Sequence, residues 1–387
     1  MDDNVVGANL ERLRVRAGLT QEEVAQQAGL SRLAYRKIEK GLTQPREGSL
    51  AALAGALEVS VRDLVTPVPR MDGVRFRSRK RMRMRDNIVA EVALHLDDYA
   101  ELEDLLQDRK RSDMSKLAMG LKGKGLDRAV TAAGRVRIEF LGKERSREPI
   151  FNICGLLEKH GIKVLTVRIA SDKFFGLSVN NERCGPAVVV NEWERISVER
   201  RIFTAAHELG HLVLHHGDWH VDVTEEPEQE EKEADAFAAE FLMPQDQFER
   251  EWANLNGQDF FDAVLKLKQV FRVSYKSVLY RLSAFYPARS GNIWARFYAL
   301  HEARYGRKLS GKEEPHGLTA EAFRTGRPES SRAAEPDTLS EANFKEDRLS
   351  SLVRRAMDGG LITMSRGAEI LRIPMMEMRA RAASWVA

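Results

Sequence analysis

Two histidines with a glutamate beside the first form the most specific chemical pattern in the chain. His207, Glu208 and His211 stand in the stretch 203–214, whose apolar residues recur with a helical period and whose run contains no proline. On a helix, residues four apart share a face, so both imidazoles can reach one metal ion. A carboxylate beside them can take a proton from a metal-bound water. The pattern therefore predicts a zinc hydrolase site with Glu208 as the general base.

A catalytic zinc site needs a third protein ligand, and an acidic segment downstream offers several. The apolar residues of 230–242 recur with a helical period, which predicts a second helix. Glu231 is our choice of third ligand, with Glu230 and Glu233 as alternatives. Asp235, one turn after Glu231, can accept a hydrogen bond from a ligand histidine. The other interpretation of this acid-rich segment is a solvated helix face.

The N-terminal segment has the spacing of a small helical bundle. Its periodicity and its Thr20, Ser31 and glycine signals predict four short helices, at 5–16, 21–28, 32–39 and 49–57. The second and third are joined by a tight turn at Gly29. Two short helices joined in this way predict a helix-turn-helix whose third helix enters the major groove of DNA.

The residues expected to contact DNA lie on these two helices. The candidates for contacts with bases and phosphates are Arg32, Leu33, Tyr35, Arg36 and Lys37. Gln21 begins the second helix, where it can hold a phosphate together with the helix N-terminus. Double-stranded operator DNA is the expected partner, and a homodimer would supply the second recognition helix of a half-site pair. The alternative is a bundle that docks only a protein.

The middle of the chain carries less specific signals. A strongly basic run, 75–85, either contacts phosphates or forms a solvated edge strand or helix start. Residues 86–106 are expected to form a connecting helix. The β-branched or alternating segments 163–168, 176–179 and 187–190 predict a small sheet before the zinc-binding helix. The histidines that follow this helix are expected to be partly exposed at its end; they are His215, His216 and His220.

Composition excludes several classes of protein. The 387 residues are 43% apolar and carry a formal net charge of +3, so charge is informative only locally. Two cysteines, Cys154 and Cys184, are too few for a disulfide framework or a thiolate zinc site. No apolar run is long enough to span a membrane, and the N-terminus lacks the regions of a signal peptide. These features predict a cytoplasmic protein without a membrane partner.

The motifs together resemble the ImmA/IrrE family of zinc metallo-endopeptidases, in its form fused to an N-terminal helix-turn-helix of the phage-repressor (XRE) type. The matching segments are 19–41, 185–191, 201–211, 231–239, 242–244 and 274–282. The resemblance implies that Glu231 is the third ligand, that one zinc ion is bound per chain, and that the protein cleaves a specific repressor or other regulator in a stress or mobile-element switch.

The expected fold is multidomain and mainly α. It begins with a four- to five-helix helix-turn-helix domain, continues with an α+β zincin-like metallopeptidase domain that has a small sheet, and ends with a small helical segment. The predicted boundaries are 1–66 for the DNA-binding domain, 67–114 for a basic hinge and connecting helix, 115–306 for the peptidase domain, 307–340 for a linker and 341–387 for the C-terminal segment. That last segment weakly resembles a second helix-turn-helix, and we expect it to cap the peptidase domain.

Two classes of function remain open from the sequence, beside a weaker third hypothesis of self-cleavage in the hinge near Pro67 or in the linker 307–336. The first is a DNA-binding regulator fused to an endopeptidase that is active or latent until signalled. The second is a transcription factor whose peptidase-like domain senses a ligand or zinc without proteolysis. The presence of Glu208 favours the first, because a pure sensor does not need a base beside the metal.

Overall fold

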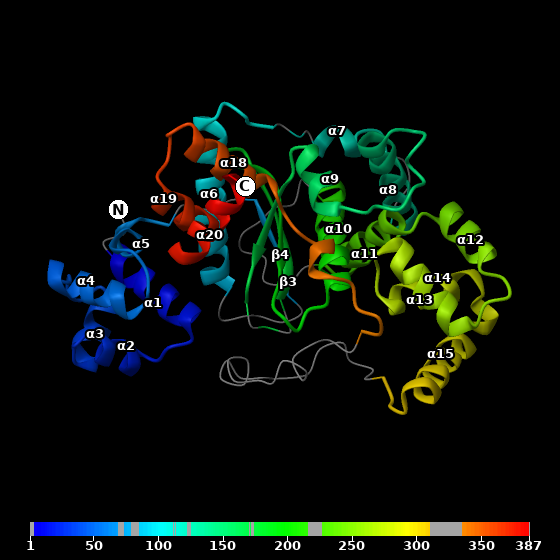
Figure 1. Cartoon of the computed structure of the whole chain (residues 1–387), viewed down its shortest axis with the longest axis horizontal. Helices are drawn as coiled ribbons and strands as arrows, with labels where there is room; N and C mark the ends of the chain where they lie inside the picture. The colour runs from blue at the N-terminus through cyan, green and yellow to red at the C-terminus, as the bar shows by residue number, and fades with distance from the viewer. Residues whose placement is uncertain are drawn as a thin grey trace. The chain divides into compact units, whose positions relative to one another are not determined.

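The structure is a computed structural model, which describes residues 4–68, 73–78, 85–110, 112, 114–121, 125–169, 171, 174–215, 227–309 and 335–386. The chain divides into two compact units. Figure 1 draws the elements of both, coloured by residue number. The first unit comprises Met1–Met71 and Met82–Asp98, and the second comprises Asp72–Arg81 and Tyr99–Ala387. Each unit is described by itself below.

The first unit opens with five short helices. They are α1 (Val5–Ala17), α2 (Gln21–Gln27), α3 (Arg32–Glu39), α4 (Glu47–Ala56) and α5 (Val61–Val65). Thr20 and Glu23 form a reciprocal capping box at the start of α2, and Ser31 caps α3. Gly29 joins the two helices with φ +66°, a conformation that disfavours other residues. The predicted helix-turn-helix domain of four to five helices is therefore present.

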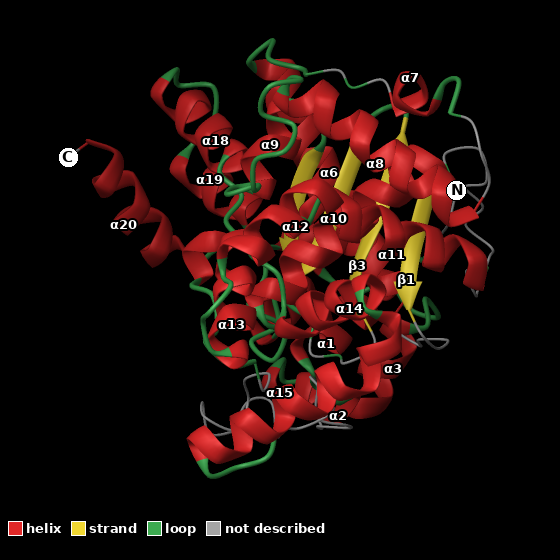
Figure 2. Cartoon of the chain, turned by 90° about the vertical axis from the view of Figure 1, so that its right-hand side faces the viewer, coloured by secondary structure: helices red, strands yellow, loops and turns green. Residues whose placement is uncertain are grey.

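The second unit is built on one mixed sheet of four strands. They are β1 (Val74–Ser78), β2 (Lys163–Val167), β3 (Phe174–Asn181) and β4 (Gly185–Asn191), in the order β1-β3-β4-β2. β3 pairs antiparallel with β1 and with β4, whereas β2 pairs parallel with β4. Figure 2 shows these strands in yellow, surrounded by helices. The three predicted strands are confirmed.

The first four residues of the basic run, 75–78, belong to strand β1. Val74 pairs with Val179 and Arg77 with Gly176, so the start of the run is an edge strand of this sheet. The edge strand is confirmed for those residues, but Arg75 is only 7% exposed, so the expectation of a solvated strand is wrong at that position. Positions 79–84 lie outside the described residues. The chain then forms α6 (Arg85–Leu105), the predicted connecting helix.

The central helix of the second unit is α10 (Val198–Leu214), which packs along β3 and β4 (Figure 1). Ser197 caps it by accepting a hydrogen bond from the backbone of Arg200. The helix is buried on nearly every side, because the sheet lies against one face and α8 (Gly125–Leu141) and α11 (Glu228–Leu242) lie against the others. Packing from three directions therefore fixes the position of α10, which carries His207, Glu208 and His211.

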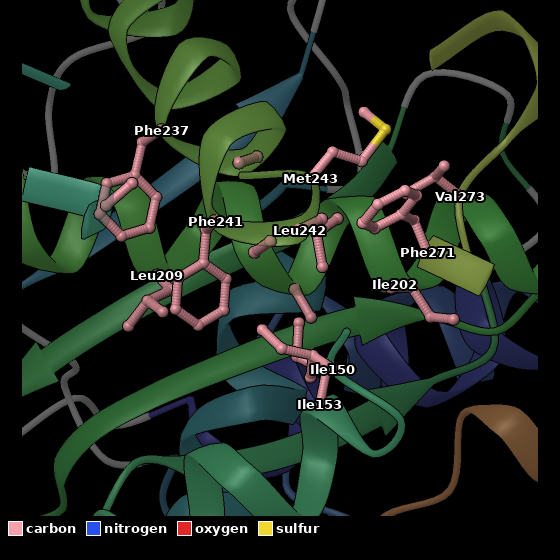
Figure 3. Packing of buried hydrophobic residues seen from close by; sticks show 14 of the residues in the cluster. Ile150, Ile153, Ile202, Leu209, Phe237, Phe241, Leu242, Met243, Phe271 and Val273 are labelled. Atoms are coloured by element: carbon pink, nitrogen blue, oxygen red, sulfur yellow. The ribbon is translucent and has the colours of Figure 1, made fainter. Parts of the chain in front are cut away.

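The core of the second unit joins these helices to the sheet. Figure 3 shows Leu209 and Ile202 of α10 among the side chains of Phe237, Phe241 and Leu242 from α11. Burying a large apolar side chain contributes roughly 1.5–3 kcal/mol. Further members of the same core are supplied by α7 (Met114–Ala118), α9 (Ile153–Lys159), α12 (Gln245–Asn254), α13 (Phe260–Phe271), α14 (Tyr275–Phe285) and α15 (Ser290–Tyr305).

The described segment that begins at Glu335 packs against α10 and α13 around a buried ionic contact. Lys268 Nζ lies 2.5 Å from Oε1 of Glu199 and 2.6 Å from the carbonyl oxygen of Asp337, and the N–H of Leu339 donates to the same Glu199 oxygen at 2.7 Å. Residues 335–340, predicted as the end of a linker, are thus fixed against α10 and α13. Positions 310–334 of that linker lie outside the described residues.

Three helices end the chain, α18 (Arg348–Asp358), α19 (Met364–Leu371) and α20 (Met375–Val386). Arg348 anchors α18 to the end of α6 through Glu103 at 3.0 Å. α19 and α20 repeat the backbone of α2 and α3 at a constant offset: Thr363 caps as Thr20 does, and Arg372 takes φ +56° where Gly29 takes +66°. The resemblance of this segment to a second helix-turn-helix stays a prediction, and these shared backbone features agree with it.

The expectations about fold class are confirmed, including the mainly helical composition, the small sheet and the helical C-terminal segment. The domain boundaries remain predictions. Among the described residues, no helix combines the length and apolar character needed to cross a membrane.

Candidate metal centre and DNA-binding helices

The site forms where α10 and α11 approach closely. A Cβ atom added at Gly210 would lie 3.1 Å from Cδ1 of Phe237 and 3.3 Å from Cα of Ala234. Small residues at positions 210 and 234 therefore let the two helix backbones pack closely. This approach brings the acidic first turns of α11 to the histidine face of α10.

Three side chains bring their ligand atoms together at this crossing. Nε2 of His211 lies 2.9 Å from Nε2 of His207 and 3.1 Å from Oε1 of Glu231, and the distance from His207 Nε2 to that oxygen is 3.6 Å. In a tetrahedral zinc site with bonds near 2.0–2.1 Å, ligand atoms are about 3.3 Å apart. The three observed distances scatter around this value. The donor set, two imidazoles and one carboxylate, thus fits a zinc ion.

Burial differs between the three residues. His207 and His211 are 0% exposed, whereas the Glu231 side chain keeps 29% exposure. Glu231 is therefore the one of the three side chains that solvent reaches. Among the residues that the structure describes, these three have ligand atoms close enough together to hold one metal ion. Three protein ligands are the number found in catalytic zinc sites, which keep a fourth position for water or substrate.

Asp235 lies beside the first histidine. Its Oδ1 atom is 2.8 Å from Nδ1 of His207. A carboxylate at this atom keeps the proton on Nδ1 and leaves the Nε2 lone pair for a metal. The structure places Asp235 where the sequence predicted a residue that orients a ligand histidine.

Glu208 is completely buried beside the cluster. Its Cγ atom lies 3.5 Å from the position that a Cβ at Gly176 would occupy, so β3 packs directly against this glutamate. The same added Cβ would meet Cγ2 of Thr204 at 2.6 Å and the carbonyl oxygen of Val189 at 2.7 Å. Gly176 therefore allows α10 and the sheet to pack with Glu208 between them.

The other two acidic candidates are engaged elsewhere. Glu230 forms an ion pair with Arg75 of β1. Oε2 of Glu233 lies 3.2 Å from Nε2 of His215, and its Oε1 accepts a hydrogen bond from Gln229 at 3.1 Å. The structure thus brings Glu231, rather than these alternatives, to both histidines.

His215 is not the exposed helix-end residue that the sequence suggested. It is only 6% exposed, and its Nδ1 atom lies 3.0 Å from Nδ1 of His211. Burial lowers the pKa of His215 to about 4, which keeps the ring neutral near pH 7. Burial likewise lowers the pKa of His211. His216 and His220 lie outside the described residues.

The predicted recognition helix presents a basic surface. Arg32, Arg36 and Lys37 of α3 are exposed, and Leu33 keeps 62% exposure beside them. Side chains in this pattern suit phosphate and base contacts.

Comparison with known proteins assigns both units. A family model described as a helix-turn-helix matches residues 10–64, and a model described as the IrrE N-terminal-like domain, from a peptidase family, matches residues 157–283. One relative is the uncharacterized HTH-type transcriptional regulator y4dJ of Sinorhizobium fredii (strain NBRC 101917 / NGR234). It is 46% identical over 63 residues, which are 16% of this chain and 82% of the relative.

The chain belongs to the helix-turn-helix regulators that carry an IrrE-type domain.

In this helix-turn-helix regulator, Tyr35 belongs to the core of the first unit. It is 0% exposed and donates from its hydroxyl to Oε1 of Glu39 at 3.2 Å. Burial, together with the neighbouring Glu39 carboxylate, raises the pKa of Tyr35. A side chain enclosed in this way does not reach DNA, so the prediction of Tyr35 as a DNA contact is wrong.

Gln21 also contacts Glu39, because its side-chain amide donates to Oε2 of that residue. Arg14 completes the group with a 2.7 Å contact from its Nε to Oε1 of Glu39. Glu39 thus ties α1, α2 and α3 together. The Gln21 side chain is half-buried in this group, while its place at the start of α2 keeps the predicted phosphate contact available to the helix N-terminus.

The sequence did not predict the placement of two residues near the cluster, His215 and Arg75. Arg75 donates to the carbonyl oxygen of His215 at 3.4 Å and pairs with Glu230. The only available signal for His215 was its position four residues after His211, which places both on one helix face. Nothing in the local sequence identified Arg75, because its partners are more than a hundred residues away.

Proposed function

We propose that this regulator binds operator DNA through α2 and α3 and carries a zinc-dependent endopeptidase site in its second unit. The observation that supports this most directly is the His207–His211–Glu231 cluster, whose ligand atoms all lie within 4.8 Å of one another, with Glu208 buried beside it. In this proposal the three residues are the metal ligands, one zinc is bound per chain, and Asp235 orients His207.

The proposed reaction is hydrolysis of a peptide bond. A zinc ion held by these residues would lower the pKa of a bound water and would polarise the carbonyl oxygen of the substrate. Glu208 is the proton carrier: its carboxylate takes the proton of the attacking water and delivers it to the leaving amine. Its burial between α10 and β3 holds the carboxylate in one place beside the histidines. His207 and His211 bind through Nε2, because Asp235 and His215 occupy their Nδ1 sides.

We further propose that the substrate is a specific repressor or other regulator, and that the protein acts in the cytoplasm as a homodimer. A DNA-binding unit in the same chain would concentrate the peptidase near proteins bound at the same operator. The domain limits proposed for these activities are 1–66 and 115–306, joined by 67–114 and followed by a linker at 307–340 and the segment 341–387.

Comparison of the wild-type chain with Glu208→Gln tests this proposal. Both are expressed in cells that lack the native copy, and new protein N-termini are sequenced across the proteome after zinc supplementation. We expect a small set of cleavage sites in one regulator that is present with wild type and absent with Glu208→Gln. The same cleavage at wild-type rate by Glu208→Gln would eliminate Glu208 as the base.

A zinc-sensing transcription factor is the second candidate, and one observation favours it. In sequence, β1 stands between the two segments of the first unit, and its Arg75 bonds to the end of α10 and to Glu230. Under this alternative, a structural change at the metal cluster reaches β1 through Arg75 and then the DNA-binding unit through the polypeptide that joins them. Under this alternative, zinc alters operator affinity equally in wild type and in Glu208→Gln, and no cleavage occurs.

A further inference from the structure

We propose that His215 is a positioning residue for the metal site: it holds the imidazole of His211 by its Nδ1 atom, so that Nε2 is presented to the metal. This inference rests on the proposed function of the cluster. The inference adds three residues to that proposal, His215, Glu233 and Gln229, which together support the candidate ligand His211.

The contacts form a continuous chain leading away from the cluster. Nδ1 of His211 lies 3.0 Å from Nδ1 of His215, Nε2 of His215 lies 3.2 Å from Oε2 of Glu233, and Gln229 donates to the other Glu233 oxygen at 3.1 Å. His211 and His215 are both buried, and Glu233 is 8% exposed. Hydrogen bonds at such depth hold side-chain orientation strongly.

Metal binding fixes the direction of every donor in this chain. When Nε2 of His211 binds a metal, its proton must be on Nδ1, which then donates to Nδ1 of His215. His215 accepts there, so its own proton is on Nε2 and is donated to the Glu233 carboxylate. No carboxylate contacts Nδ1 of His211 in the described contacts. His215 thus passes the orienting effect of the Glu233 carboxylate on to that atom.

The two histidine ligands are therefore oriented by different means. His207 donates directly to Asp235, whose side chain is 50% exposed. His211 donates to a buried neutral ring backed by Glu233. The backbone at His215 is held by Arg75, which donates to its carbonyl oxygen at 3.4 Å. The end of α10 is thereby fixed from β1 on one side and from α11 on the other.

Two substitutions separate positioning from simple packing. In His215→Asn, the amide oxygen replaces the accepting Nδ1 atom and keeps the contact with His211. In His215→Gln, the longer side chain fills more of the volume and reaches toward Glu233, but it places its polar group near the former Nε2 position. If His215 only fills space, Gln should be the better replacement. If it positions His211, Asn should be.

The experiment measures metal binding by the full chain. Zinc affinity is obtained by competition with a chromophoric chelator, and the absorption spectrum is recorded after loading with Co²⁺. We expect His215→Gln to lose zinc affinity by roughly 10- to 100-fold, with an altered cobalt spectrum, and His215→Asn to stay close to wild type. His301→Gln, which makes the same change at another buried histidine, on α15, is the matched control and should bind as wild type does.

Circular dichroism of the metal-free proteins shows whether each variant is folded. Glu233→Gln provides a second route that leaves position 215 intact, and it should weaken zinc binding in the same direction. Wild-type zinc affinity in both His215→Gln and Glu233→Gln, or better retention by Gln than by Asn at position 215, overturns the positioning role and leaves the proposed function standing. Absence of zinc binding by wild type overturns the proposed function itself.

Discussion

Nδ1 of His207 lies 2.8 Å from Oδ1 of Asp235, one helical turn beyond Glu231 on α11. One helix therefore supplies both a candidate ligand and the residue that orients another candidate ligand. The close approach at Gly210 makes this possible, because a larger residue there would separate α10 from Ala234 and Phe237.

Replacing this carboxylate should weaken metal binding without removing it. In Asp235→Asn, the neutral amide holds the His207 ring less strongly, so we expect zinc affinity to fall about 10-fold. Chelator competition on the folded protein measures the change. An unaltered affinity would show that His207 is oriented without Asp235.

Two glycines of the second unit should respond oppositely to alanine. At Gly176 the added Cβ would lie 2.7 Å from the Val189 carbonyl oxygen, so Gly176→Ala should destabilise the unit by about 1–3 kcal/mol. At Gly134 on α8 nothing lies within 4 Å, so Gly134→Ala should stabilise the helix by roughly 0.5–1 kcal/mol. Urea denaturation measures both. Equal effects at the two positions would contradict the close packing of β3 on α10.

The recognition surface is tested on α3. Arg36→Ala and Lys37→Ala should each weaken operator binding and reduce the salt dependence by about one phosphate contact. Tyr35→Phe should cost about 1 kcal/mol of folding stability through the lost Glu39 hydrogen bond while sparing DNA affinity. Fluorescence anisotropy at several salt concentrations separates these cases. A loss of affinity in Tyr35→Phe as large as that in Arg36→Ala would return Tyr35 to the interface.

Stability should depend on pH through Glu158 of α9. Burial raises the pKa of Glu158 to about 7. The folded state therefore binds the proton more tightly than the unfolded chain does, and this contribution to stability is lost as pH rises from about 4.5 through 7. Glu158→Gln should be more stable than wild type by about 1–3 kcal/mol near pH 8, with the difference vanishing near pH 4.5. A difference that is constant with pH would show that Glu158 does not titrate in this window.

The parts of the site that follow from local spacing could be predicted from the sequence. His207, Glu208 and His211 share one uninterrupted helix, and Glu231 and Asp235 share a face of the next. Periodicity alone does not choose between Glu231, Glu230 and Glu233, because all three lie within one turn of the same acidic helix. The family resemblance pointed to Glu231, and the crossing of α10 and α11 brings this residue to both histidines.

The remaining contacts depend on pairing that sequence periodicity does not encode. β1 joins the sheet as an edge strand far from β3 in sequence, and only this pairing brings Arg75 to the end of α10. His215 is buried because Arg75 and Glu233 converge on it from two other elements. The burial of Tyr35, by contrast, could have been predicted from the sequence, because its spacing of three from Ile38 places both on the core face of α3.

Bound zinc per chain tests the central claim most directly. Wild type, Glu231→Gln and Glu228→Gln are loaded with zinc, desalted and measured by atomic emission. Glu228→Gln is the matched control, because it makes the same chemical change on the same helix. The Glu228 side chain is exposed and pairs with Lys232. The account predicts about one zinc per chain in wild type and in Glu228→Gln, and a large loss in Glu231→Gln. Zinc retained equally by Glu231→Gln, or absent from wild type, would contradict it.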